Sequence, residues 1–214
     1  MKTYYLPFSR FDKMKNFNQL FKDENETKIK IFYSADRLFA EKGYNGVSMR
    51  EISEKSGISK PMIYYYFGNK EGIYRSLLEF GLNQGIEKAK KISNLPISSK
   101  LKLIKLIQTR FQLSYQFPEF AKFFLSIFIT TEKLPFIANL KTKAKQHQQI
   151  FINVIQEGVE SGEFGVGANP ELAVEIIMSV LAHFIIKQLK IKKKILTDKL
   201  AEDIVELLFK GLNE

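Results

Sequence analysis

Apolar residues recur at intervals of three and four positions in segment after segment of this 214-residue chain, and this spacing constrains the fold more than any other feature. Such spacing places apolar side chains on one face of an α-helix. Alternation of apolar and polar residues, which would indicate β-strands, never runs for a useful length, and no segment is repeated. Glycine and proline are sparse and fall where helices would end. The sequence therefore predicts an all-α fold.

About nine helices are expected from this spacing and its breaks. Their ranges are 24–42, 48–56, 59–66, 70–90, 99–116, 119–130, 135–161, 170–190 and 197–211. Before them, residues 1–23 carry apolar side chains near helical spacing together with several cations. This segment is expected to be a short amphipathic helix docked on the body or to be disordered; a basic arm and a membrane-surface segment are the alternatives.

The chain contains no cysteine, which excludes disulfides, thiolate metal sites and a cysteine nucleophile. Two histidines without cysteine do not make a metal site, and no cofactor is expected. The net charge of +10 and the pI of about 9.5 favour a polyanionic partner, but each half of the chain carries +5, so charge alone does not locate the contact. Because no apolar run reaches roughly 18 residues and no secretory signal is present, we expect a cytoplasmic protein without membrane insertion.

Residues 48–70 meet the physical demands of a helix-turn-helix. Ser48 and Glu51 have the spacing of a capping box that begins one short helix. Gly57 supplies a turn residue that tolerates a positive φ, and Ser59 is expected to cap the next helix, with Pro61 in its first turn. Ser53 is small enough for close helix crossing. The sequence thus predicts two short helices joined by a tight turn.

The second of these helices keeps its polar and aromatic side chains on the outward face, where they suit the major groove of DNA. Lysine and hydroxyl groups bind phosphates or base edges, and aromatic rings contact thymine methyl groups. A packing or protein-interface function for the tyrosine cluster is the competing interpretation. The predicted DNA-binding residues are Ser48, Met49, Arg50, Ser59, Lys60, Pro61, Met62, Tyr64, Tyr65 and Lys70.

From about residue 27 to 75 the chain resembles the N-terminal domain of TetR-family regulators. In that family alanine is usual where this chain has Ser53, and members begin only a few residues before their first helix, so the segment before Glu24 is a departure. The residues that carry the resemblance are Ala35, Phe39, Gly43, Tyr44, Ser48, Ile52, Ser53, Gly57, Ser59, Lys60, Ile63, Tyr64, Tyr65, Tyr66, Phe67, Asn69, Lys70 and Tyr74.

The resemblance implies a homodimer whose two N-terminal DNA-binding domains bind a near-palindromic double-stranded DNA operator. It also implies that the last two helices of each subunit form a four-helix dimer interface. A small hydrophobic molecule that binds in the C-terminal helical domain (the body) is expected to move the fourth helix and so release the DNA. The division expected is an extension (1–23), a helix-turn-helix domain (24–70) and a helical domain for ligand binding and dimerisation (71–214).

Two sets of body residues follow from the apolar pattern. Aromatic walls suit an apolar or aromatic ligand, although a plain aromatic core is the competing interpretation. Apolar stripes on the last two helices suit a dimer interface or, alternatively, an intramolecular core. The ligand-binding candidates are Phe111, Tyr115, Phe124, Phe128, Phe151 and His183. The dimer candidates are Leu181, Phe184, Leu200, Ile204 and Leu208.

The function expected is a ligand-responsive, sequence-specific transcriptional repressor. Two alternatives remain open: a DNA-binding regulator controlled by a protein partner, and an architectural DNA-binding protein without a sensor. An enzyme is not expected, because the sequence has no paired-carboxylate motif, no Ser/His/Asp spacing and no phosphate-binding glycine loop.

Overall fold

The computed structural model describes residues 25–116, 121–122, 125, 137–165, 169–191 and 193–210. These residues form helices and connecting turns, with no strand among them, which confirms the all-α fold. The segment 1–23 and most of the helix expected at 119–130 lie outside the described residues.

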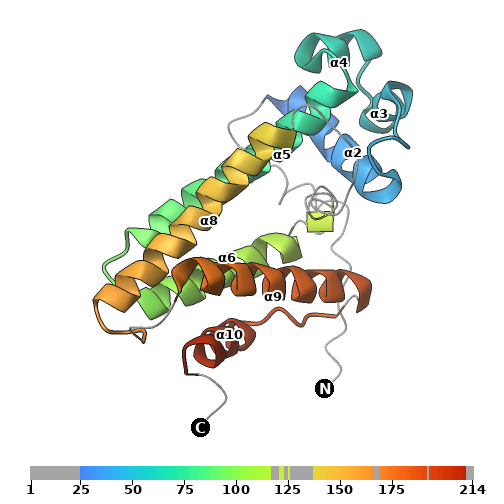
Figure 1. The fold of residues 1–214 in the computed structure, drawn as a ribbon. Helices are drawn as coiled ribbons and strands as arrows, with labels where there is room; N and C mark the ends of the chain where they lie inside the picture. Colours follow the sequence, from blue (N-terminus) through green and yellow to red (C-terminus); the bar gives the residue numbers. More distant parts are fainter. Residues whose placement is uncertain are drawn as a thin grey trace. The chain divides into compact units, whose positions relative to one another are not determined.

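The described helices, labelled as in Figure 1, begin and end within three residues of the expected positions. They are α2 (Glu26–Lys42), α3 (Met49–Ser56), α4 (Lys60–Phe67), α5 (Lys70–Ser93), α6 (Ser99–Gln116), α8 (Ile137–Glu160), α9 (Pro170–Ile191) and α10 (Asp198–Lys210).

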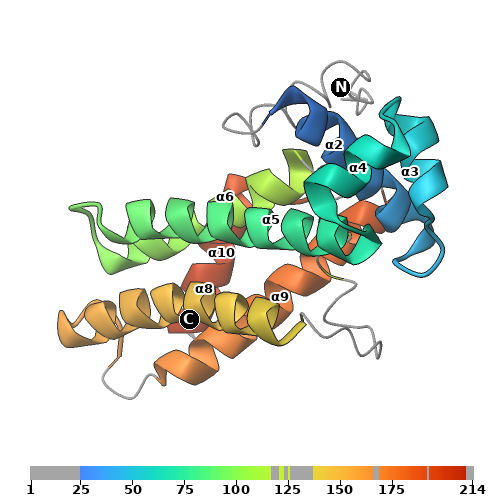
Figure 2. The ribbon, with the colours of Figure 1, turned by 90° about the horizontal axis from the view of Figure 1, so that it is seen from above.

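The chain divides into two compact units, and the boundary falls inside α5, between Gly81 and Leu82. The first unit contains α2, α3, α4 and the beginning of α5, and Figures 1 and 2 both show α3 beside α2. Its core is formed by apolar side chains from all four helices. The members with the least exposure are Ile31, Ala35, Ile52, Ile63, Ile73, Leu77 and Leu78.

The second unit contains the end of α5 together with α6, α8, α9 and α10. The helices α6 and α8 are joined by Lys102, whose buried ammonium lies 2.6 Å from a carboxylate oxygen of Glu157. The first turn of α6 is held by Glu163, which accepts hydrogen bonds from the amides of Ser99 and Lys100 at 3.1 and 3.0 Å. These contacts satisfy amides that a helix start leaves without partners.

The helix α9 is the most apolar of the described helices. By length and composition it would reach across a membrane, with a mean hydropathy of 1.7, but core helices of soluble proteins have the same features. Leu172 and Ile176 are exposed on it, whereas Ile177 and Leu181 are fully buried within the chain. One face of α9 therefore packs inside the unit and another presents apolar surface.

Candidate DNA-binding site

The start of α3 is fixed by the capping box expected from the sequence. The hydroxyl of Ser48 accepts from the amide of Glu51 at 3.2 Å, and the Glu51 carboxylate accepts from the amide of Ser48 at 2.8 Å. The ammonium of Lys42, at the end of α2, lies 2.6 Å from the same carboxylate. The hydrogen bonds from Lys42 and Ser48 lower the pKa of Glu51 to about 2. A single side chain therefore joins the end of α2 to the start of α3.

The turn between α3 and α4 is closed by Gly57 and Ser53. Gly57 adopts a φ of 71° in the left-handed region, as the sequence predicted, and a side chain there would be strained. The hydroxyl of Ser53 donates to the carbonyl of Ile58 at 2.7 Å, across the turn. An alanine would make no such bond, so Ser53 adds a hydrogen bond to the turn.

The prediction for Ser59 was only partly correct. Ser59 does occupy the N-cap position of α4, with Pro61 in the first turn, but its hydroxyl makes no capping hydrogen bond. Its φ and ψ are those of a cap, although no side-chain hydrogen bond accompanies them. The exposed hydroxyl is available to an external acceptor such as a phosphate oxygen.

The face of α4 that points away from the core is aromatic and exposed. Beneath it, Ile52 and Ile63 are fully buried and lock the two short helices together. Tyr65 is 80% exposed, and Met62 and Tyr64 are nearly half exposed. Large apolar and aromatic side chains rarely remain in water in this way unless they bind something. Lys60, at the start of α4, is exposed as well.

The three cations predicted to hold phosphates or bases have different surroundings. Lys60 and Arg50 are exposed, and the Nε of Arg50 lies 3.6 Å from the carboxylate of Glu54. The ammonium of Lys70 donates to the carbonyl of Tyr44 at 2.9 Å and lies 4.4 Å from the centre of the Tyr44 ring. Lys70 therefore ties the start of α5 to the turn before α3. The sequence did not predict this contact, because it joins positions 26 residues apart.

The predicted ligand residues are divided between the interior and the surface of the second unit. Phe111 and Phe151 are buried, and Tyr115 is partly exposed, with the ammonium of Lys194 5.6 Å from its ring centre. His183 is exposed on α9, so it does not lie with the buried aromatic residues. Phe124 and Phe128 lie outside the described residues.

The predicted dimer residues differ in their exposure within one chain. Leu181 is fully buried within a single chain, so it packs in the core of its own unit. Phe184, Leu200, Ile204 and Leu208 are partly exposed. The most exposed apolar side chains on α9 and α10 are Leu172 at 57% and Leu207 at 56%.

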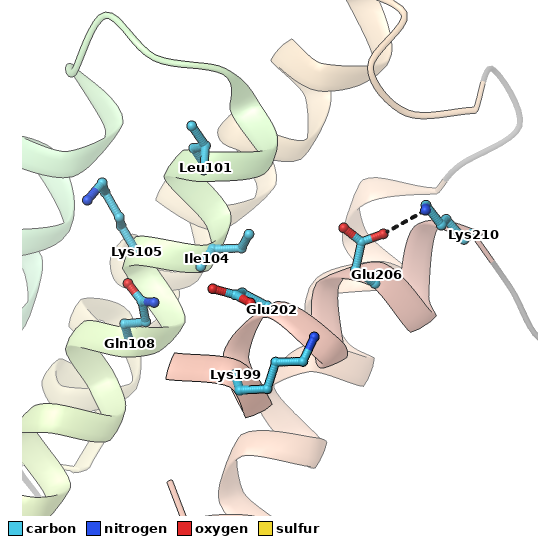
Figure 3. Close-up of a pocket in the computed structure, with 8 residues that line it drawn as sticks. All are labelled: Leu101, Ile104, Lys105, Gln108, Lys199, Glu202, Glu206 and Lys210. Atoms are coloured by element: carbon cyan, nitrogen blue, oxygen red, sulfur yellow. Dashed lines mark ion pairs between the residues drawn. The ribbon is translucent and has the colours of Figure 1, made fainter. Parts of the chain in front are cut away.

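A groove of about 590 Å³ lies between α6 and α10 in the second unit (Figure 3). Three lysines and two glutamates contribute to its lining, and the carboxylate of Glu206 lies 3.2 Å from the ammonium of Lys210. None of the predicted ligand residues lines it. This lining suits water and ions better than an apolar ligand.

The comparison with known proteins identifies the family. Residues 31–77, which contain α3, α4 and their turn, match the model of the bacterial regulatory proteins of the tetR family. The chain is also 31% identical over 142 residues to the probable HTH-type transcriptional regulator YttP of Bacillus subtilis, covering 64% of this chain and 67% of that protein. The chain belongs to the TetR family. It is a DNA-binding regulator of transcription, as the α3–α4 geometry indicates.

A further relative and a solved structure align along most of the chain. The fatty acid metabolism regulator protein of Bacillus subtilis is 25% identical over 185 residues, covering 86% of this chain and 95% of the relative. The crystal structure of the regulator FadR from Bacillus subtilis in complex with stearoyl-CoA has a TM-score of 0.74 at 25% identity, covering 86% of this chain and 98% of that one. The similarity therefore includes the body as well as the DNA-binding part.

Proposed function

We propose that this TetR-family protein is a repressor that binds a near-palindromic operator as a homodimer and leaves it when a long apolar molecule binds the second unit. The observation that carries the proposal is the exposed aromatic face of α4 above a fully packed core. A rigid helix that presents Lys60, Tyr64 and Tyr65 to solvent suits the major groove.

The remaining residues of α3 and α4 supply contacts around this face. Arg50 and the hydroxyl of Ser59 bind phosphates, with Met49, Pro61 and Met62 packing beside the DNA backbone. Ser48 serves mainly through its cap, which orients the first amides of α3. Lys70, which holds the start of α5 at the turn through Tyr44, would also place its positive charge near a phosphate of the bound DNA.

The dimer surface proposed here is the exposed face of α9 and α10. Leu172, Ile176 and Leu207 expose apolar area that a partner copy would cover, which is a favourable change of about 25 cal/mol for each Å² removed from water. His183 lies two helical turns after Ile176 on the same face of α9, so we assign it to this surface rather than to the ligand site.

The ligand proposed is a long-chain acyl compound, by similarity to the Bacillus subtilis regulator that was crystallised with stearoyl-CoA. Its apolar part would pack against Phe111, Phe151 and the ring of Tyr115, and Phe124 and Phe128 remain candidates for the same site. The helix α5 belongs to both units, so a change along its second half, residues 82–93, would be transmitted to Lys70 and Tyr44.

The experiment that tests the function is a binding titration of the full chain against DNA from beside its own gene, with a scrambled duplex as competitor. The wild type is expected to bind specifically, and Tyr65→Ala to weaken binding by roughly tenfold or more through the loss of a base-edge contact. The matched control is Leu95→Ala, which removes an exposed apolar side chain from the second unit. An equal loss of DNA affinity in both variants, or no loss in Tyr65→Ala, would refute the assignment of α4 as the helix that reads the DNA.

The ligand response is tested by adding stearoyl-CoA to the preformed protein–DNA complex. Release of DNA at micromolar ligand is the result expected for a repressor of this kind. Unchanged binding in the presence of stearoyl-CoA would favour control by a protein partner or an architectural function instead.

A further inference from the structure

Two polar side chains, one buried and one partly buried, meet beside the apolar core of the second unit. Arg110 lies on α6 among the buried residues Leu106, Ile107 and Phe111. His147 lies on α8, is only 9% exposed, and its ring centre is 5.5 Å from that of Phe151. Apolar helix stripes of this kind normally pack without charge, so the pair requires an explanation.

The contact between the two side chains fixes the state of the histidine. The Nη1 of Arg110 lies 3.5 Å from the Nδ1 of His147. A guanidinium can only donate, so Nδ1 accepts and the ring carries its proton on Nε2. Burial and then the positive charge of Arg110 lower the pKa of His147 to about 3. His147 is therefore neutral and does not compensate the charge beside it.

No carboxylate within the described parts of the chain lies within ion-pair distance of Arg110. The sequence of α6 contains no Asp or Glu, and the first acidic residue of α8 is Glu157, which pairs with Lys102. Burial lowers the pKa of Arg110, but an arginine keeps its charge in proteins. Arg110 is partly buried. A cation that is withdrawn from water without an anion beside it lowers stability, and such costs are typical of binding sites.

The surroundings add positive charge and reach α5. Lys143 lies one turn before His147 on α8, and its ammonium donates to the side-chain oxygen of Asn83 on α5 at 3.0 Å. Near the other edge of the imidazole, α5 carries Gly85, where an added Cβ would lie 3.9 Å from the Nε2 of His147. Any group that binds Arg110 and His147 therefore lies close to the helix that continues to the DNA-binding unit.

We infer that Arg110, with His147 beside it, binds an anionic group of the ligand whose apolar chain packs against Phe111 and Phe151. The inference rests on the proposed function and defines its ligand class as an amphipathic anion. The planar guanidinium offers donors that match a carboxylate or a phosphate. Both a free fatty acid and an acyl-CoA thioester combine a long apolar chain with such a group, so the two sources must be separated by experiment.

The test measures the affinity of three probes, stearate, stearoyl-CoA and the uncharged methyl stearate, for the full-length wild type, Arg110→Met and Lys105→Met. Lys105→Met is the matched control, since it removes an exposed cation from the same helix. The wild type is expected to bind one anionic probe roughly 10- to 100-fold more tightly than methyl stearate. Arg110→Met should lose that preference while its affinity for methyl stearate stays within about twofold, and Lys105→Met should retain the preference.

Thermal unfolding without ligand separates a binding function from a structural one. Arg110→Met is expected to unfold at the same temperature as the wild type or higher, because it removes a partly buried charge that has no anion beside it in the described parts of the chain. Tight binding of stearate identifies the free acid, and tight binding of stearoyl-CoA alone identifies the thioester; either supports the inference.

Two results would overturn the inference while leaving the proposed function intact. One is equal affinity of the wild type for charged and uncharged probes. The other is an Arg110→Met variant that keeps the preference for the anionic probe but unfolds at a lower temperature. If the wild type binds none of the three probes, the proposed ligand class fails, and the inference fails with it.

Discussion

The substitution Gly158→Ala is expected to destabilise the second unit, although alanine ordinarily favours a helix. Gly158 lies near the end of α8, and the ring of Phe164 covers it directly. An added Cβ would overlap that ring and would lie 3.0 Å from the Cβ of Ser99 at the start of α6. Phe164 cannot move away easily, because its ring stacks on Phe209 of α10 at a centroid distance of 3.8 Å.

The magnitude follows from two opposing terms. Forcing an extra methyl group into a packed interior costs about 1–3 kcal/mol. Replacing glycine by alanine inside a helix contributes about 1 kcal/mol in the other direction. Because two neighbours confine the site, we expect the cost to lie in the upper part of its range. The net loss of unfolding free energy is then about 1–2 kcal/mol, or a Tm lower by roughly 2–8 °C.

Urea and thermal unfolding followed by circular dichroism would measure this change. The matched control is Gly85→Ala in α5, where an added Cβ meets only His147 at an ordinary contact distance of 3.9 Å. That variant should be stabilised by up to about 1 kcal/mol, because only the helix-propensity term remains. The same chemical change should thus have opposite effects at the two positions.

A second variant makes the reasoning about Phe164 refutable. In a background that already carries Phe164→Ala, the ring is absent, and Gly158→Ala should become neutral or stabilising. If Gly158→Ala is stabilising in the wild-type background, or equally destabilising with and without Phe164, the proposed overlap is wrong.

Three further predictions concern the turn, the cap and the interface. Ser53→Ala should lower the unfolding free energy by roughly 0.5–1.5 kcal/mol through loss of the hydrogen bond across the turn; an unchanged urea midpoint would contradict this. Hydrogen bonds from Lys42 and Ser48 hold the pKa of Glu51 near 2, below its ordinary value of 4.5. The stability that the ionised Glu51 adds to the fold is therefore complete above pH 4.5 and is lost as the pH falls towards 2. Between pH 4.5 and 2 the Tm of Glu51→Gln should fall less than the Tm of the wild type. If both proteins show the same dependence of Tm on pH, the ionisation of Glu51 does not contribute to stability. Leu172→Glu combined with Leu207→Glu should give monomers in sedimentation, whereas Tyr65→Ala should remain dimeric; dimers of the double variant would place the interface elsewhere.

Local rules predicted the cap of α3 and the turn after it well. The Ser48–Glu51 cap joins residues three positions apart, and the left-handed turn at Gly57 depends on one residue, so both can be predicted from the sequence. The hydroxyl of Ser59 shows the limit of such rules. Its position as a cap was correct, but the absence of its capping hydrogen bond depends on the orientation of one side chain, which residue type does not determine.

Long-range contacts were not predictable in this way. Arg110 and His147 are 37 positions apart on different helices, and nothing in either local pattern indicates that they meet. The apolar character of α9 limits prediction in a different way. Apolar residues cover more than one of its faces, so helical spacing could not separate Leu181, which packs inside the chain, from Leu172, which is exposed.

The most direct test of sequence-specific DNA binding through α3 and α4 is the salt dependence of operator affinity in Arg50→Ala and in the exposed body variant Lys105→Ala. Each phosphate contact contributes about 0.9 to the slope of log affinity against log salt concentration. Arg50→Ala should therefore lower the wild-type slope by about 1, while Lys105→Ala should leave it unchanged. A slope that falls in Lys105→Ala but not in Arg50→Ala would show that DNA binds another surface of the protein.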